Sequence, residues 1–300
     1  MNRSGIINIY KEKGYTSHDV VNIVRGLAKC KAGHTGTLDP DAEGVLPVCL
    51  GRATKISDYI MADDKEYIAN VILGTETTTQ DASGEVLSQK PFLGNLFDVN
   101  DALQKFIGQV QQLPPMYSAI KVKGKKLYEH ARQGEEVERK TRQITIHAIE
   151  LLSADLPDFF RIKVACSKGT YIRALCADLG KALDSVAHMD ELLRTRSGSF
   201  SVENAIKIDD LRDIAAYDEL DRVIMPIEGA LGHFPRIIIS NKVEKWMRNG
   251  NKIPLEYVSG ILCEKTSSYE EYLAHDQDGN LAGIYVQIGQ EYIKPKVMLL

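Results

Sequence analysis

The sequence lacks the cysteine pattern of a disulfide-bonded or zinc-binding protein. Its 300 residues include five cysteines, an odd number, and no two of them form a C-x-x-C pair. Scattered cysteines of this kind are typical of free thiols in a reducing compartment. The composition therefore predicts a cytoplasmic protein without a structural zinc site.

Long apolar runs are missing as well. No stretch reaches the roughly eighteen apolar residues that a transmembrane helix needs, so no membrane span is expected. Residues 1–11 lack the long apolar region and the small-residue cleavage site of a signal peptide. The apolar fraction of 44% is that of a globular protein, and the length allows one large domain or a large and a small one.

Hydrophobic spacing predicts alternating strands and helices through the first two thirds of the chain. Strands are expected over 6–10, 45–50, 66–75, 144–152 and 159–165, with a hairpin turn at 81–84. Helices are expected from the caps Thr16 and Ser17 to about Leu27, over 53–62 and 99–110, and over 171–183 behind a Thr170 cap.

Two changes in composition suggest where a first domain ends. Residues 209–228 carry seven acids and two arginines, and their spacing predicts a helical segment that closes this domain. From about Pro235, short strands and one short helix predict a small all-β unit of about sixty-five residues.

A loop rich in glycine and acid, residues 33–44, leads into an apolar strand and carries Asp39. Pro40 restricts the backbone of Asp39 to extended conformations, which holds its carboxylate in one orientation. A calcium loop starting at Asp39 would need glutamate at its twelfth position, where Leu50 stands. A phosphate loop fails too, because six residues instead of four separate its two glycines. An ordinary Asx-type turn and a catalytic loop both stay open.

Positive charge is concentrated in residues 121–142, although the net charge of the chain is −4. The net charge argues mildly against a nucleic-acid partner, but this segment carries eight basic residues against four glutamates. It is either a solvated surface or an arm that follows phosphates, and composition leaves both open. The basic residues are Lys121, Lys123, Lys125, Lys126, Arg132, Arg139, Lys140 and Arg142.

Five motifs, in the same order along the chain, resemble those of the TruB-type tRNA pseudouridine-55 synthases. They are G-H-T-G-T-L-D-P at 33–40 followed by G-V-L at 44–46, K-E-Y at 65–67, L-P-P-M-Y-S-A at 113–119, C-S-K-G-T-Y-I-R at 166–173, and a leucine- and arginine-rich segment at 188–200. The matches cover most of residues 5–206. One departure is Leu193, which stands where the family has an arginine.

The resemblance implies an α+β protein. It implies a pseudouridine-synthase fold over residues 1–230, with a mixed, mainly antiparallel sheet flanked by helices, and a PUA-like RNA-binding domain over 232–300. It also implies isomerisation of uridine 55 in the T stem-loop of tRNA. The glycosidic C–N bond breaks and a C–C bond forms to the same base, so nothing is oxidised. No cofactor and no metal are therefore expected, and a monomer is the default.

The same resemblance assigns roles to individual residues. Asp39 is the catalytic carboxylate, and Arg173 pairs with it and lowers its pKa. The residues expected to wall the uracil pocket are Tyr67, Tyr171 and Leu192, and His34 fills the space that the extruded base leaves. The residues expected at the RNA backbone are Lys65, Lys121, Lys123, Lys125 and Lys126, most of them in the clamping insertion 121–142.

Some questions stay open at this point. Asp39 could attack C1′, attack C6 or assist glycal formation, and Tyr67 is one candidate for the base that takes the C5 proton. Guide-dependent rRNA modification is an alternative, disfavoured because no extra basic terminus or longer PUA domain is visible. A tRNA-folding module without important turnover is another, and the intact Asp39 favours an active enzyme.

Overall fold

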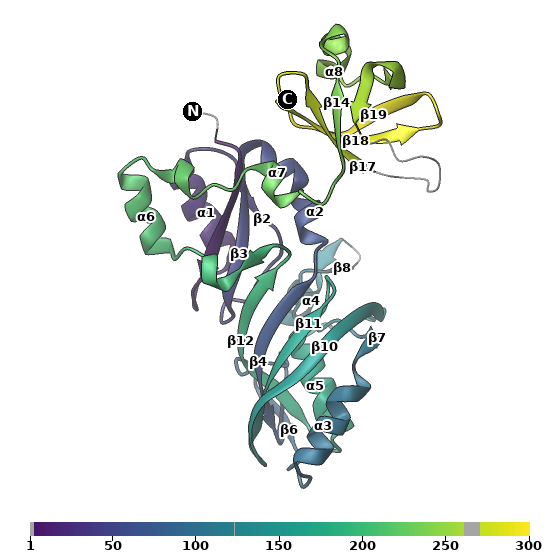
Figure 1. Ribbon diagram of the computed structural model, residues 1–300. Coiled ribbons are helices and arrows are strands. Elements are labelled where there is room, and N and C mark those ends of the chain that lie inside the picture. The colour runs from purple at the N-terminus through teal and green to yellow at the C-terminus, as the bar shows by residue number, and fades with distance from the viewer. Residues whose placement is uncertain (1–2, 123, 261–270) are drawn as a thin grey trace.

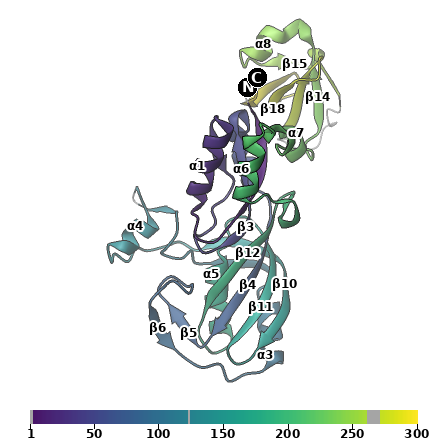
Figure 2. The same ribbon diagram turned by 90° about the vertical axis from the view of Figure 1, so that its left-hand side faces the viewer.

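The structure, a computed structural model, describes residues 3–122, 124–260 and 271–300. Within these ranges the chain builds two large β-sheets, one of nine strands and one of six. Figure 1 shows the smaller sheet at one end of an elongated body, with α3 (Leu96–Lys105) at the opposite end. The six-stranded sheet lies near the N-terminus of the chain in both views (Figures 1 and 2).

The nine-stranded sheet is the frame of the body. Its main order is β1 (Gly5–Lys11), β3 (Glu43–Leu50), β12 (Ala187–Ser197), β4 (Lys65–Leu73), β11 (Phe159–Cys166), β10 (Arg142–Asp155) and β7 (Gly108–Gln112). Two short strands, β2 (Ala32–His34) and β13 (Phe200–Ser201), add to β3 and β12. All neighbours are antiparallel except β12 and β3, which are parallel. The predicted mixed, mainly antiparallel sheet is confirmed.

Helices cover this sheet in two groups. Besides α3, the helices of the described ranges are α1 (Ser17–Ala28), α2 (Ser57–Met61), α4 (Leu127–Arg132), α5 (Ile172–Ala182), α6 (Ile208–Ala216), α7 (Ile227–Ala230) and α8 (Glu244–Arg248). One core lies between β1, β3, α1 and α6, and another between the central strands, α3 and α5. No helix in these ranges is long and apolar enough to cross a membrane.

Helix α1 shows how local sequence sets an element. Thr16 and Asp19 form a reciprocal capping box, in which each side chain accepts the backbone N–H of the other. Val20, Val21 and Val24 recur at helical spacing and are buried against β1 and β3. The predicted cap and helix are both confirmed.

The six-stranded sheet is docked onto the body rather than tethered to it. Its order is β15 (Ile253–Pro254), β19 (Tyr292–Met298), β18 (Leu281–Ile288), β17 (Glu271–Asp276), β14 (Arg236–Ile239) and β16 (Val258–Gly260). Leu273 and Ile284 of this sheet share one buried core with Ile56 of the body. Arg52 Nη1 also donates to the carbonyl of Leu299 at 2.5 Å. The expected domains, 1–230 and 232–300, would meet in the segment between α7 and β14, and both this division and the PUA-like assignment stay predictions.

Three local predictions differ from the structure. The helix expected over 99–110 ends at Lys105, and residues 108–112 form the edge strand β7, because Gly108 has φ of +104° and the segment pairs with β10. Thr170 does not cap α5, since its hydroxyl donates to the carbonyl of Ser167 and Tyr171 occupies the N-cap. The helix expected over 53–62 is a 3-10 turn, Gly51–Ile56, followed by α2.

Two short hairpins flank the face that carries the glycine-rich and proline-rich loops. One joins β5 (Thr75–Thr77) to β6 (Val86–Gln89) around the predicted turn at 81–84. The other joins β8 (Lys121–Val122) to β9 (Lys125–Lys126) and leads into α4. In Figure 2, the segment around α4 projects from the body, above β5 and β6.

Candidate active site

Asp39 lies where the two halves of the large sheet meet. The parallel contact between β12 and β3 pairs Leu193 with Glu43, just after the loop that carries Asp39. Ser17 of α1 holds this loop on one side, because its hydroxyl accepts the N–H of Leu38 at 2.9 Å and donates to the Leu38 carbonyl at 3.0 Å. The backbone of the loop is therefore anchored immediately before Asp39.

Lys11 anchors the other side of the same loop. Its side chain is fully buried at the end of β1, and Nζ donates to the carbonyls of Pro40 at 2.9 Å and Ala42 at 2.5 Å. Burial lowers the pKa of the Lys11 ammonium to about 8, and the nearby carboxylate of Asp39 opposes this shift. Nothing in the sequence indicates this role, since a lysine at the end of a strand is usually exposed.

Arg173 and Asp39 lie together as expected. Arg173 Nε is 3.0 Å from Asp39 Oδ2, and Nη2 is 3.2 Å from Oδ1, so the guanidinium grips both carboxylate oxygens. Nη1 also donates to the Thr79 carbonyl at 3.1 Å, and Nη2 donates to the Tyr117 carbonyl at 2.9 Å. One side chain on α5 thus connects three loops that are distant in sequence.

A second carboxylate shares this arginine. Asp81 Oδ2 is 3.4 Å from Arg173 Nη1. The Asp81 carboxylate is held by the hydroxyls of Thr79 and Ser83, each donating to Oδ1 at 2.6 Å. The sequence indicates Asp81 only as a turn residue, because nothing in a D-A-S-G turn shows what its carboxylate faces.

Burial decides the net electrostatics of Asp39. Desolvation raises the pKa of the Asp39 carboxyl above its usual value, Arg173 lowers it, and Asp81 raises it. The expected effect of Arg173 is present, but the net direction is upward. The side chain is 38% exposed, and its exposed part lines a cavity. The guanidinium therefore offsets part of the cost of keeping a carboxylate charged in this partly dry site.

A cavity of about 640 Å³ opens over Asp39. Its walls bring together residues from all five sequence motifs, including Tyr67, Tyr171, Arg173 and Leu192. Tyr67 and Leu192 are buried on the neighbouring strands β4 and β12. A second hollow of about 510 Å³ adjoins the first, and the two share Asp39.

His34 lies apart from these walls. It ends β2, and its Nδ1 accepts the backbone N–H of Gly36 at 3.3 Å. Desolvation and the charge of Arg194 lower the pKa of the His34 imidazole, which favours its neutral form. His34 is not among the residues lining either hollow, and its expected role in the vacated stack stays a prediction.

Arg194 holds the backbone on both sides of the loop that carries Asp39. Its place in a motif did not indicate this role. It is buried, and its guanidinium donates to the carbonyls of Val45 at 2.7 Å and Gly36 at 3.1 Å. Its own carbonyl oxygen would lie 2.3 Å from a Cβ placed at Gly44, which has φ of +104°. The neighbouring Leu193, where the family has arginine, lies half-buried in the middle of β12.

The structure corrects the expectation for Lys65. Its side chain is buried, and Nζ donates to the Met61 carbonyl at 2.7 Å and to the Asp63 carbonyl. Burial lowers the pKa of the Lys65 ammonium to about 8. The amine therefore closes the C-terminal end of α2 beside the cavity and is not free at the surface to follow the RNA backbone.

The other lysines lie on the projecting segment 121–142. Lys121 and Lys125 are exposed, Lys126 is half-buried, and Lys123 lies outside the described residues. Lys126 Nζ and the Arg132 guanidinium each lie 5.4 Å from the centre of the Tyr128 ring.

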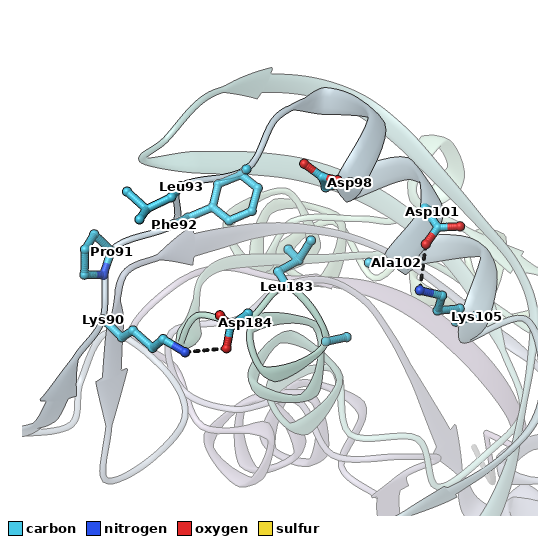
Figure 3. A pocket seen from close by; sticks show the side chains of 12 residues that line it. Lys90, Pro91, Phe92, Leu93, Asp98, Asp101, Ala102, Lys105, Leu183 and Asp184 are labelled. Carbon is cyan, nitrogen blue, oxygen red and sulfur yellow. Dashed lines mark hydrogen bonds and ion pairs between the residues drawn. The ribbon is translucent and has the colours of Figure 1, made fainter.

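A further hollow of about 570 Å³ lies at the base of the body, between the segment 90–94 that follows β6, helix α3 and the end of α5. Figure 3 shows two ion pairs on its rim, Lys90 with Asp184 at 2.5 Å and Lys105 with Asp101 at 2.6 Å. None of the predicted site residues lines it. Among the described residues, no group of histidine, cysteine and acidic side chains could hold a metal ion.

Comparison with known proteins gives a consistent result along the chain. Residues 24–172 match the model for the TruB family pseudouridylate synthase N-terminal domain, and residues 173–232 match that for the tRNA pseudouridylate synthase B C-terminal domain. The tRNA pseudouridine synthase B of Halalkalibacterium halodurans is 40% identical and covers 100% of this chain and 98% of its own. The tRNA pseudouridine synthase B of Alkaliphilus oremlandii is 46% identical, over 87% of this chain and 86% of its own.

Solved structures share the fold. A Cbf5–Nop10–Gar1 complex contains a chain that superposes with a TM-score of 0.75 and 26% identity, over 99% of this chain and 85% of that one. A chain of the archaeal box H/ACA sRNP Nop10–Cbf5 complex superposes with a TM-score of 0.74 and 24% identity, over 99% of this chain and 86% of that one. The body therefore has the pseudouridine-synthase fold, with an all-β unit at its C-terminal end.

Proposed function

The chain belongs to the TruB family of pseudouridylate synthases, and we propose that it isomerises uridine 55 in the T stem-loop of tRNA. Enzymes of this family isomerise uridine. The observation that carries the proposal is the Asp39 carboxylate, held on both oxygens by Arg173 at a cavity walled by Tyr67, Tyr171 and Leu192. The names of the relatives at 40–46% identity support tRNA as the substrate.

The reaction needs a carboxylate close to the glycosidic bond. The bond from C1′ to N1 breaks, the base turns, and a bond from C1′ to C5 forms, after which the C5 proton leaves and N1 takes a proton. Asp39 acts at C1′, at C6 or in glycal formation, and in each case it acts as the carboxylate. The two contacts to Arg173 favour that ionised form against desolvation.

The cavity suits one nucleotide taken out of its stack. Its volume of about 640 Å³ lies in the usual range for small-molecule sites. Burial raises the pKa of the Tyr67 phenol, so the ring stays neutral and can stack on uracil without carrying charge. This works against Tyr67 as the base for the C5 proton. His34 then fills the gap that the extruded base leaves, which recovers part of the stacking energy.

The projecting segment supports RNA binding. Lys121 and Lys125 are exposed on this segment. Tyr128 of the same segment lines both hollows at Asp39, so the segment reaches the cavity. Phosphate contacts by these lysines outweigh the net negative charge, because the acids are concentrated in 209–228. The six-stranded sheet serves as the PUA-like domain and contacts the acceptor side of the tRNA.

The test is Asp39→Asn assayed on an unmodified tRNA transcript. Asparagine keeps the shape and removes the charge, so the rate of pseudouridine formation should fall by a factor on the order of 10³ or more. The affinity for tRNA should stay within about threefold. Asp210→Asn, an exposed aspartate on α6 that lines neither hollow, is the matched control and should leave the rate unchanged.

A second substrate tests the target position. A transcript with cytidine at position 55 should yield no pseudouridine, and a transcript altered at other uridines should react normally. Turnover by Asp39→Asn would refute the role of the aspartate. Product formed at another position would refute the assignment of uridine 55 and leave the role of Asp39 intact.

A further inference from the structure

Gln112 is a buried amide whose nitrogen and oxygen both bond to the backbone of one other residue. It ends β7 and is 3% exposed. Its Nε2 donates to the Tyr171 carbonyl at 3.0 Å, and its Oε1 accepts the Tyr171 N–H at 2.8 Å. Fifty-nine residues separate the two positions in sequence. Both polar ends of the amide therefore hold the same point of the chain.

That point is the beginning of the helix that carries Arg173. Tyr171 is the N-cap of α5, and its side chain makes no capping hydrogen bond. The first N–H groups of a helix have no partner within the helix and must be satisfied from outside. Gln112 supplies one such acceptor from the edge strand β7. Arg173, which grips Asp39, follows in the first turn of the same helix.

The same glutamine stands at the base of the projecting segment. In the register between β7 and β10, Gln112 is opposite Arg142. The chain leaves the sheet after Gln112, forms the proline-rich stretch and the segment 121–142, and returns to the sheet at Arg142. On the way, the Tyr117 carbonyl accepts a hydrogen bond from Arg173 at 2.9 Å. Gln112 thus joins the root of this segment to the start of α5.

We propose that Gln112 is a positioning residue that holds Tyr171 and Arg173 in register with the RNA-binding segment 121–142. The proposal rests on the proposed function of the site. Gln112 fixes Tyr171, and with it the following Arg173, to the end of β7. The chain leaves the sheet toward the segment 121–142 at this same point. A shift of about 1 Å in such groups can slow an enzyme about 100-fold without a direct contact to the substrate.

The first test is Gln112→Leu, which keeps a similar shape and removes both hydrogen bonds. The single-turnover rate of pseudouridine formation at saturating tRNA should fall about 10- to 100-fold, with the tRNA dissociation constant within about threefold of wild type. Gln111→Leu is the matched control, because Gln111 is the exposed neighbour on the same strand, and its rate should be unchanged. A defect confined to tRNA binding, or a wild-type rate for Gln112→Leu, would overturn the proposal.

The second test is Gln112→Glu, which gives a readout that a general decrease in stability would not. A neutral carboxylic acid can donate one hydrogen bond and accept one, as the amide does here, whereas a carboxylate can only accept and would repel the Tyr171 carbonyl. The rate of Gln112→Glu relative to wild type should therefore rise as the pH falls. The same ratio for Gln112→Leu should stay flat.

A flat ratio for Gln112→Glu would contradict the role of the two hydrogen bonds, and it decides the question even if Gln112→Leu fails to fold. Wild type in the same assay separates the two proposals. A wild type that forms no pseudouridine on tRNA removes the proposed function. An active wild type beside equally active variants removes only the role of Gln112.

Discussion

Replacing Arg173 by lysine tests the arrangement around Asp39 most directly. The Arg173 side chain is 6% exposed and reaches both oxygens of Asp39 together with the carbonyls of Thr79 and Tyr117. Lysine keeps the positive charge but offers a compact ammonium in place of a planar fork. It can approach one Asp39 oxygen and cannot hold both loop carbonyls at the same time. Arg173→Lys therefore removes geometry while preserving charge.

The expected decrease in rate can be worked from these hydrogen bonds. A hydrogen bond to a charged group contributes roughly 1.5–3 kcal/mol in a buried setting. The second bond to Asp39, which lysine cannot make, is discounted to about 1 kcal/mol, because that carboxylate is 38% exposed. Lysine can keep one of the two bonds to the carbonyls that position the loops, and the loss of the other adds about 1.5–3 kcal/mol. A total of about 2.5–4 kcal/mol corresponds to a rate roughly 70- to 900-fold lower.

The pH dependence should change in a defined direction. Burial and the charge of Asp81 raise the pKa of Asp39, and Arg173 lowers it. A single ammonium group lowers it less, so the pKa of Asp39 in the variant lies above that in wild type. Activity requires the carboxylate and is lost as the pH falls through this pKa. The acid limb of the rate profile should therefore move to higher pH in Arg173→Lys.

The assay is single-turnover pseudouridine formation on saturating unmodified tRNA, measured across pH. Arg222→Lys is the matched control, because Arg222 is an exposed partner of Glu219 and lines neither hollow at Asp39, and its profile should equal that of wild type. A rate within about threefold of wild type for Arg173→Lys, with an unmoved acid limb, would refute the reasoning. It would mean that a positive charge near Asp39 is enough for activity, and that the contact of Arg173 with both carboxylate oxygens is not needed.

Two further predictions concern RNA binding and stability. Replacing the exposed Lys121 and Lys125 by alanine should weaken tRNA binding and reduce the slope of log affinity against log salt by about 1 for each phosphate that is no longer neutralised; an unchanged slope would identify a merely solvated surface. Gly44→Ala should lower the free energy of unfolding by about 2–4 kcal/mol in urea denaturation, because its Cβ would lie 2.3 Å from the Arg194 carbonyl oxygen. Gly26→Ala, in an open position of α1, should be neutral or stabilising, and equal effects at both glycines would contradict the steric explanation.

Motifs that act locally could be predicted from the sequence. The capping box of Thr16 and Asp19 involves residues three apart, and α1 forms where it was expected. The turn at 81–84 was expected for the same reason. The family motifs went further, since they indicated that Asp39 and Arg173 pair across 134 residues. That pairing came from a resemblance, because no spacing rule connects positions so far apart.

Which polar side chains are buried, and what they contact, could be seen only in the folded chain. Lys65 could be expected at an RNA backbone, but the end of α2 lies against it and places two carbonyls around its amine. Asp81, Arg194 and Gln112 look like ordinary turn, strand and edge residues in the sequence. Their partners lie on other elements, and their burial follows from how the sheet and α5 pack.

Sequence patterns were enough to predict α1, the turn at 81–84 and the family to which the motifs point, and the resemblance to that family supplied the chemistry expected of Asp39. The fold decided the net pKa direction of Asp39, the use of Lys11 and Arg194 as loop supports, and the link from Gln112 to α5. The physical reason is that caps and turns depend on neighbours within a few residues. Desolvation and hydrogen bonds to buried carbonyls depend on every element that packs around a group, and these come together only when the chain is folded.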